Sequence, residues 1–185
     1  SKVLDISSIL ISDRTRESAE TRRRIRQAYK RYGKRAQAMM LTDRIFRMAS
    51  VWYAEVYSQY ARTWMYRFDY ETPAMRLTAL HACHSSDIPY VFGNFHARQY
   101  KWMFLFPSPR PRRVLGAIQG DFIRFAKTGF LPWRRCHGGE TPAKCYDKHC
   151  RVRPMVEPDI EREYEKSDFK RRSFKGLDYM GAGQR

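Results

Sequence analysis

Several features that would assign a function directly are absent from this sequence. No run of about 20 apolar residues occurs, so no segment has the composition of an ordinary transmembrane helix. No G-x-S-x-G motif occurs, so the sharp turn that presents a nucleophilic serine is not encoded. The first residues lack the apolar block of a signal peptide, which leaves the compartment open with the cytoplasm as the default expectation. The sequence is basic and has no candidate transmembrane segment. Any catalytic or binding chemistry must come from residues outside these absent motifs.

Paired C-x-x-C spacing is also absent. The cysteines are Cys83, Cys136, Cys145 and Cys150. His137 and His149 are interleaved with the last three, and thiolates with imidazoles are zinc ligands. Because structural zinc sites usually contain C-x-x-C pairs, we expect no metal and no other cofactor. An even cysteine count would permit disulfides in a secreted chain, and free thiols are the default expectation.

Acidic residues are scarce. The sequence has 19 Asp and Glu against 36 Lys and Arg, a net charge of +17, and such an excess is typical of proteins that bind nucleic acid or an anionic surface. Only two runs are dense in basic residues, and they are Arg14 to Arg35 and Lys170 to Lys175. A charge run is more often a solvated face than a binding site, so polyanion binding is kept as the alternative function. A hydrophobic content of 43% indicates a globular chain, and the length fits one domain.

The apolar pattern predicts two helices followed by a strand. Glu17 to Tyr32 reads as a basic helix ended by Gly33, and Thr42 can cap a second helix. The second helix is predicted to bury one stripe, formed by Ile45, Phe46, Ala49, Trp52, Tyr53, Val56 and Tyr57. Aromatic residues then alternate from Trp64 to Tyr70 with a period of two, which marks a strand that Pro73 ends.

The most informative stretch is ACHSSDIPYVFGN, residues 82–94, which sets a histidine in a polar turn before an apolar run. Histidine has an unperturbed pKa near neutrality and can take and return a proton at working pH. The stretch resembles the region around the catalytic histidine of type-B carboxylesterases, a branch of the α/β-hydrolases with the pattern G-A-x-H-G-x-E-[LI]-x-[YF]-V-F-G. The resemblance implies that His84 is the general base and that Asp87 replaces the supporting glutamate. Ser85 replaces the glycine after the histidine, and His81 is the rival base.

Flanking segments resemble the same family in the same order. Residues 42–73 are similar to its "D-x-x-F…A…Y-x-Y-x-F-D-Y" segment, residues 117–133 to its "W-x-x-F-A-K-T-G-x-P" helix, and residues 141–156 more loosely to its ending. The resemblance is strongest over 42–129 and weaker to 156, and 157–185 form a basic tail. It implies an α/β fold: the C-terminal portion of an α/β-hydrolase, with late strands of the central sheet and flanking helices, as a single partial domain over 1–185 that is incomplete alone.

The resemblance implies a carboxylic ester hydrolase of the serine-esterase mechanism, acting on a small-molecule carboxylic ester. Such an enzyme needs a serine nucleophile, an orienting acid and oxyanion donors besides the histidine. CHGGE at Cys136 to Glu140 is similar to an oxyanion loop, but it follows the histidine instead of preceding the serine. We therefore expect the isolated chain to be inactive and to need an N-terminal esterase portion. The alternative is a non-catalytic binding or interaction protein for nucleic acid or another polyanion.

Overall fold

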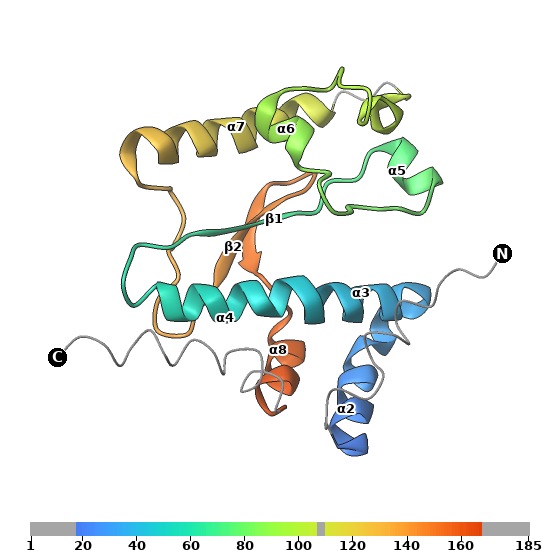
Figure 1. The fold of residues 1–185 in the computed structure, drawn as a ribbon, viewed down its shortest axis with the longest axis vertical. Helices are drawn as coiled ribbons and strands as arrows, with labels where there is room; N and C mark the ends of the chain where they lie inside the picture. Colours follow the sequence, from blue (N-terminus) through green and yellow to red (C-terminus); the bar gives the residue numbers. More distant parts are fainter. Residues whose placement is uncertain (1–17, 107–109, 168–185) are drawn as a thin grey trace. The chain divides into compact units, whose positions relative to one another are not determined.

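The structure is a computed structural model that describes residues 18–106 and 110–167 (Figure 1). It divides into two compact units, residues 1–56 with 156–185 and residues 57–155. The predicted basic run Lys170 to Lys175 and the first residues of the run from Arg14 lie outside the described residues. The single partial domain over 1–185 stays a prediction.

The first unit is helical. Its elements are α2 (Ala19–Tyr29), the 3₁₀ helix η1 (Lys30–Arg35), α3 (Ala36–Thr42), the π-helical turn η2 (Asp43–Arg47), α4 (Met48–Tyr57) and α8 (Pro158–Glu165). Ser18 Oγ accepts the Thr21 N–H at 3.1 Å and so caps the start of α2. The predicted helix end at Tyr32 is wrong by three residues, because the chain tightens into η1 after Tyr29. Gly33 does adopt a positive φ of 54°, where glycine is unstrained.

Two predictions for the second helix are wrong. Thr42 is not a cap, because α3 runs on through η2 into α4 and the Thr42 side chain makes no capping bond. The predicted stripe is wrong in part: its member Trp52 is buried, but Phe46 and Tyr53 are more than half exposed, and the buried Met48, Val51 and Ala54 lie outside it. The helix carries apolar residues on more than one side, so the sequence period alone does not show which side is buried.

Asp43 is a buried carboxylate that joins helices of the first unit. Tyr29 donates its hydroxyl hydrogen to Asp43 Oδ2 at 2.8 Å, and Arg47 lies 2.9 Å from Oδ1. Tyr164 of α8 donates to the carbonyl of Met40 at 3.3 Å. Burial raises the pKa of Tyr29, with smaller contributions from Tyr164 and Asp43. The buried charge therefore has both an ion-pair and a hydrogen-bond partner, as burial of a charge requires.

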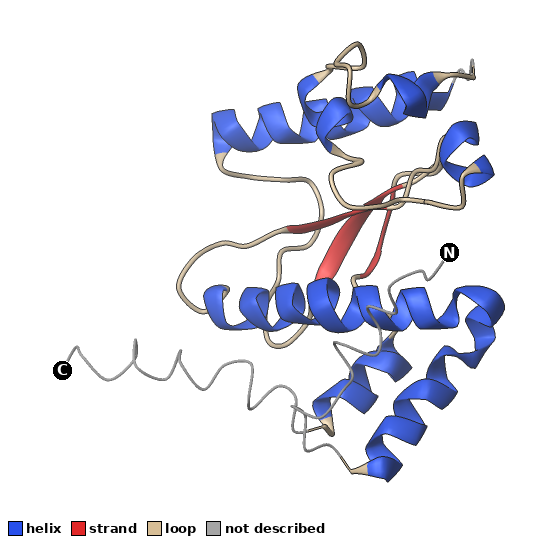
Figure 2. Cartoon of the chain, turned by 45° about the vertical axis from the view of Figure 1, so that its right-hand side comes forward, coloured by secondary structure: helices blue, strands red, loops and turns tan. Residues whose placement is uncertain are grey.

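The second unit contains a three-stranded sheet in the order β1-β2-β3 (Figure 2). β1 (Met65–Phe68) pairs in parallel with β2 (Pro142–Tyr146), with Met65 opposite Ala143, and β2 pairs antiparallel with β3 (Arg151–Pro154). The predicted strand is confirmed at its centre, since β1 lies within 64–70. Among the described residues β1 has a strand neighbour on one side only.

Helices connect β1 to β2. They are α5 (Pro73–Leu77), α6 (Ile88–Phe92), the 3₁₀ helix η3 (Lys101–Phe104) and α7 (Arg110–Thr128), with α6 beside α7 in Figure 1. The alternating aromatic residues of the β1 segment face these helices: ring centroids lie 5.9 Å apart for Trp64 and Phe125, 5.4 Å for Tyr66 and Phe122, and 5.0 Å for Phe68 and Tyr90. The period of two thus places one continuous aromatic face against α6 and α7.

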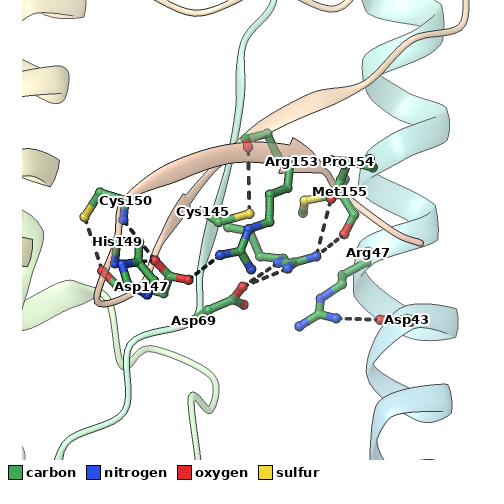
Figure 3. Close-up of polar contacts among 12 residues, drawn as sticks. Asp43, Arg47, Asp69, Cys145, Asp147, His149, Cys150, Arg153, Pro154 and Met155 are labelled. Atoms are coloured by element: carbon green, nitrogen blue, oxygen red, sulfur yellow. Dashed lines mark hydrogen bonds and ion pairs between the residues drawn. The ribbon is translucent and has the colours of Figure 1, made fainter. Parts of the chain in front are cut away.

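The turn between β2 and β3 is built around Asp147 (Figure 3). Its Oδ1 accepts the backbone N–H groups of His149 at 2.7 Å and Cys150 at 2.9 Å, and Arg153 lies 2.8 Å from Oδ2. Burial opposes ionisation, but these hydrogen bonds and Arg153 lower the pKa of Asp147 overall. The carboxylate therefore fixes a turn in which Cys150 has a positive φ of 52°.

Two further predictions concern side chains and helix composition. The four cysteines are free thiols, as expected. Over residues 18–106 and 110–167, no helix combines the length and apolar character that crossing a bilayer requires.

Candidate functional site

His84 opens the turn of residues 84–87 that leads from the β1–α5 segment into α6, and its side chain is exposed. The turn is closed on itself by Ser86. The Ser86 N–H donates to the Cys83 carbonyl at 3.1 Å, and the buried Ser86 hydroxyl donates to the same oxygen at 2.7 Å. One side of the turn is therefore fixed by internal hydrogen bonds while the histidine lies on the other, toward solvent.

The backbone on both sides of the histidine is left-handed. His81 has a φ of 52° and Ser85 a φ of 65°. Residues with a Cβ rarely adopt this region, and a left-handed conformation costs roughly 1–2 kcal/mol in an L-residue. In the pattern G-A-x-H-G-x-E the two glycines fall on these two positions. The chain thus keeps the turn that glycine would allow, with side chains that strain it.

Asp87 ends the turn and ties it to the sheet. The Tyr66 hydroxyl of β1 donates to Asp87 Oδ2 at 3.0 Å, and the Asp87 carbonyl accepts the N–H groups of Tyr90 and Val91 at 2.9 Å. Burial, and then the neighbouring Asp87 carboxylate, raise the pKa of Tyr66 to about 12. Tyr66 therefore stays protonated at neutral pH and remains a hydrogen-bond donor to the turn.

The helix after the turn is anchored by Tyr90 and Gly93. Tyr90 is fully buried, and its ring centroid lies 5.7 Å from that of Tyr70. Gly93 ends α6 with a φ of 66°, and a Cβ there would lie 2.9 Å from Gln119 Nε2 of α7. Gln119 donates from that nitrogen to the Val91 carbonyl at 3.3 Å. Glycine suits this position because it adopts the left-handed conformation without steric cost and leaves room for the Gln119 side chain.

The rival histidine has a carboxylate partner. His81 Nδ1 lies 3.1 Å from Glu71 Oε1, and both side chains are partly buried, at 31% and 21% exposed. An acid beside an imidazole nitrogen is the arrangement that orients a catalytic histidine. The structure therefore gives His81 a local acid within this chain, whereas His84 has the more exposed ring.

Sequence reasoning had not assigned a role to Tyr66 or Glu71. Tyr66 was predicted only as a strand residue, and its contact with Asp87 spans 21 positions. The bond from Glu71 to His81 spans 10 positions. Neither spacing corresponds to a helical or strand period, so nothing in the pattern marked these pairs.

The other candidate groups of the sequence do not form sites. His137 and Glu140 exchange two backbone hydrogen bonds at 3.1 and 3.0 Å across Gly138 and Gly139, both with positive φ, so CHGGE is a tight hairpin with those N–H groups already used. In the described part of the chain, the one close group of three possible metal-ligating side chains is Glu55, Glu161 and Glu165. The cysteines and histidines considered as zinc ligands do not form a close group of three among the described residues.

Comparison with known proteins gives consistent matches. The model of the carboxylesterase family matches residues 5–157. A para-nitrobenzyl esterase of Bacillus subtilis (strain 168) is 34% identical over 94 residues, which are 51% of this chain and 19% of that protein. A solved PNB esterase structure matches with a TM-score of 0.60 and 26% identity, over 71% of this chain and 27% of its own.

A second solved structure extends the match. The carboxylesterase of Geobacillus stearothermophilus, solved at pH 6.2, gives a TM-score of 0.64 and 24% identity over 88% of this chain and 33% of its own. At that identity the likeness bears on the fold alone. The chain spans about a fifth to a third of the length of these relatives.

Proposed function

This chain belongs to the carboxylesterase family and has part of the α/β-hydrolase fold, and from that premise we propose that it is the C-terminal part of a carboxylic ester hydrolase. His84 acts as the general base, and Asp87 supports its turn. The serine nucleophile, the orienting acid and the oxyanion donors belong to an N-terminal portion. The substrate is a small-molecule carboxylic ester.

The observation that carries this proposal is the conformation around His84. Left-handed residues stand at the two positions where the family pattern has glycine, one three residues before the histidine and one directly after it. A turn of this shape supports the register in which His84, rather than His81, occupies the catalytic position. The exposed ring of His84 further supports it, because a general base must reach the proton that it abstracts.

Four observations support a division of the active site between this chain and another portion. The sequence has no G-x-S-x-G motif, and it matches at most a third of the length of its relatives. On its open side β1 carries backbone groups able to pair with a further strand. Phe122, Ile123 and Phe125 of α7 are also exposed, although they are large and apolar.

In the proposed mechanism the serine attacks the ester carbonyl while His84 takes its hydroxyl proton. His84 then returns this proton to the departing alcohol, which leaves an acyl-enzyme, and water activated by the same histidine hydrolyses it. The bond from Tyr66 to Asp87 holds the turn in place during both proton transfers. No step requires a metal or another cofactor.

The test is hydrolysis of a short-chain p-nitrophenyl ester. We expect the chain alone to act no faster than an unrelated histidine-containing protein. Fusion or co-expression with an N-terminal carboxylesterase portion should restore turnover that an organophosphate blocks and that His84→Ala abolishes. A folded, associated complex without activity, or activity of the chain alone that His84→Ala leaves intact, would contradict the proposal.

A further inference from the structure

Helix α2 carries arginines on two different faces. On one face Arg24 lies 2.9 Å from Glu20 and 3.2 Å from Glu163 of α8, and Arg31, just beyond the helix, pairs with Asp159 of α8. The acidic residues of α8 therefore neutralise the cations on the side that packs against it. Ile25 and Tyr29 are buried beside this contact.

The other face carries Arg22, Arg23 and Arg26, and Lys30 continues this face as the residue that caps the end of α2 and begins η1. These four residues are here called the cationic strip. At 100° per residue these four positions fall within an arc of about 100°, and they extend over about 12 Å of helix. Arg23, Arg26 and Lys30 are exposed and Arg22 is half-buried. Within the described residues no ion pair or side-chain hydrogen bond engages any of the four.

Repulsion within the cationic strip lowers the stability of the helix. Arg22, Arg26 and Lys30 follow one another at a spacing of four, and like charges at this spacing repel. Acidic side chains that relieve such repulsion are available to Arg24 and Arg31, yet they are not placed along the strip. Four adjacent cations without counter-charges form a surface of high positive potential that attracts anions.

The composition of the strip distinguishes between polyanions. An amphipathic helix that enters a membrane surface needs an apolar face beside its cations, but Ile25 and Tyr29 of α2 are buried in the first unit. Arginine forks match phosphate oxygens, and the strip contains no aromatic side chain on which a base could stack. These features favour contacts to a phosphate backbone without base recognition.

We propose that the cationic strip of α2 binds the phosphate backbone of nucleic acid without sequence preference. This binding is independent of ester hydrolysis, because it uses no residue of the His84 turn and requires no N-terminal portion. It is an electrostatic interaction, so its affinity falls as salt concentration rises.

The experiment compares two variants of equal composition. One replaces the strip (Arg22→Gln, Arg23→Gln, Arg26→Gln and Lys30→Gln), and the control replaces four exposed cations of α7 (Arg112→Gln, Arg113→Gln, Arg124→Gln and Lys127→Gln). Each variant has three arginines and one lysine fewer, and glutamine keeps a helix propensity close to that of arginine. Circular dichroism and thermal melts confirm that each variant is folded.

Fluorescence anisotropy of a labelled DNA duplex of unrelated sequences, measured over a series of salt concentrations, gives the affinity and its salt slope. We expect the strip variant to bind roughly tenfold more weakly or worse, with a slope flatter by about 0.9 for each phosphate that the protein no longer neutralises. The control should keep most of the affinity, and the melting temperature of the strip variant should not fall, because repulsion is relieved.

Three results would overturn the proposal. Equal reductions of affinity in the two variants would mean that net charge alone attracts the duplex. Wild-type chain that fails to bind the duplex at low salt would remove the interaction itself. Strip-dependent binding to vesicles containing phosphatidylserine, with no strip-dependent binding to the duplex, would assign the surface to an anionic membrane.

Discussion

Tyr66 donates a hydrogen bond from its hydroxyl to Asp87 Oδ2 over 3.0 Å, and this bond connects strand β1 to the last residue of the histidine turn. The Tyr66 ring packs edge-on against Phe122 of α7, with centroids 5.4 Å apart. The position of the turn is therefore coupled to the sheet and to α7 through one side chain. Asp87 is one methylene shorter than the glutamate of the family pattern, and the Tyr66 hydroxyl still reaches its carboxylate.

The first prediction concerns this bond. In an active complex, Tyr66→Phe should lower kcat about tenfold with little change in KM, because a hydrogen bond to a charged group contributes about 1.5–3 kcal/mol and part of this free energy positions the histidine turn. Tyr146→Phe is the matched control, since its ring also packs against Tyr66, with centroids 5.9 Å apart, but its hydroxyl donates to Asp121 at 2.8 Å and not to Asp87. Steady-state kinetics and thermal melts of both variants separate positioning from general stability. An equal fall of kcat in the two variants would count against a role for Tyr66.

The second prediction concerns the strained turn. Ser85→Gly should raise the free energy of unfolding by about 1 kcal/mol or slightly less, because glycine adopts the φ of 65° without steric cost and this gain is partly offset by its freedom in the unfolded chain. Ser86→Gly should be destabilising, since it removes the hydroxyl that donates to Cys83. Urea denaturation measures both. If Ser85→Gly proved as destabilising as Ser86→Gly, the turn would not be strained at this residue.

The third prediction separates the two histidines. With an N-terminal portion supplied, His84→Ala should lower kcat by several orders of magnitude with little effect on KM, because a general base acts in the transition state more than in substrate binding. His81→Ala should cost much less and act mainly on stability, because it removes the imidazole that lies 3.1 Å from Glu71. His96→Ala serves as a remote control. A His81→Ala variant that is folded yet as inactive as His84→Ala would move the base to the His81 and Glu71 pair.

The fourth prediction concerns alkaline pH. The pKa of Tyr66 is raised from 10.0 to about 12 in the folded protein, so the folded state holds its proton where the unfolded state has lost it. The contribution of Tyr66 to the free energy of unfolding is therefore fully present below pH 10 and is lost as pH rises toward 12. Burial also raises the pKa of Tyr90 and Tyr146, which extends the loss in the same direction. Urea denaturation at increasing pH, with tyrosinate absorbance as a second signal, should show a shallower fall for Tyr66→Phe.

Sequence patterns predicted the parts of the fold that rest on local chemistry. The aromatic alternation predicted β1, and the resemblance of residues 117–133 to a helix of the family predicted the second half of α7, which ends at Thr128. The start of α7 at Arg110 was not predicted. Pro111 lies in its first turn, where proline is tolerated, but the resemblance began only at Ala117.

Other features depend on which surfaces meet and were not predictable from the pattern. The helix from Ala36 to Tyr57 has apolar residues on more than one side, so its period did not reveal that Met48 and Val51 are buried while Phe46 and Tyr53 are exposed. At the site, the histidine and Asp87 were found from their local motif. Their partners Tyr66 and Glu71 come from earlier segments and are joined to the turn only by the fold.

The parallel pairing of β1 with β2 also has a consequence for how the protein reaches its native state. Met65 pairs with Ala143, 78 positions later, whereas the β2–β3 hairpin closes over a short turn. Closing the longer loop costs more chain entropy, and pairing of distant strands slows folding. We expect β2–β3 to form early and β1 to join late, which would delay the bond from Tyr66 to Asp87. Amide protection measured by pulsed hydrogen exchange during refolding should then appear in β2–β3 before the β1–β2 ladder.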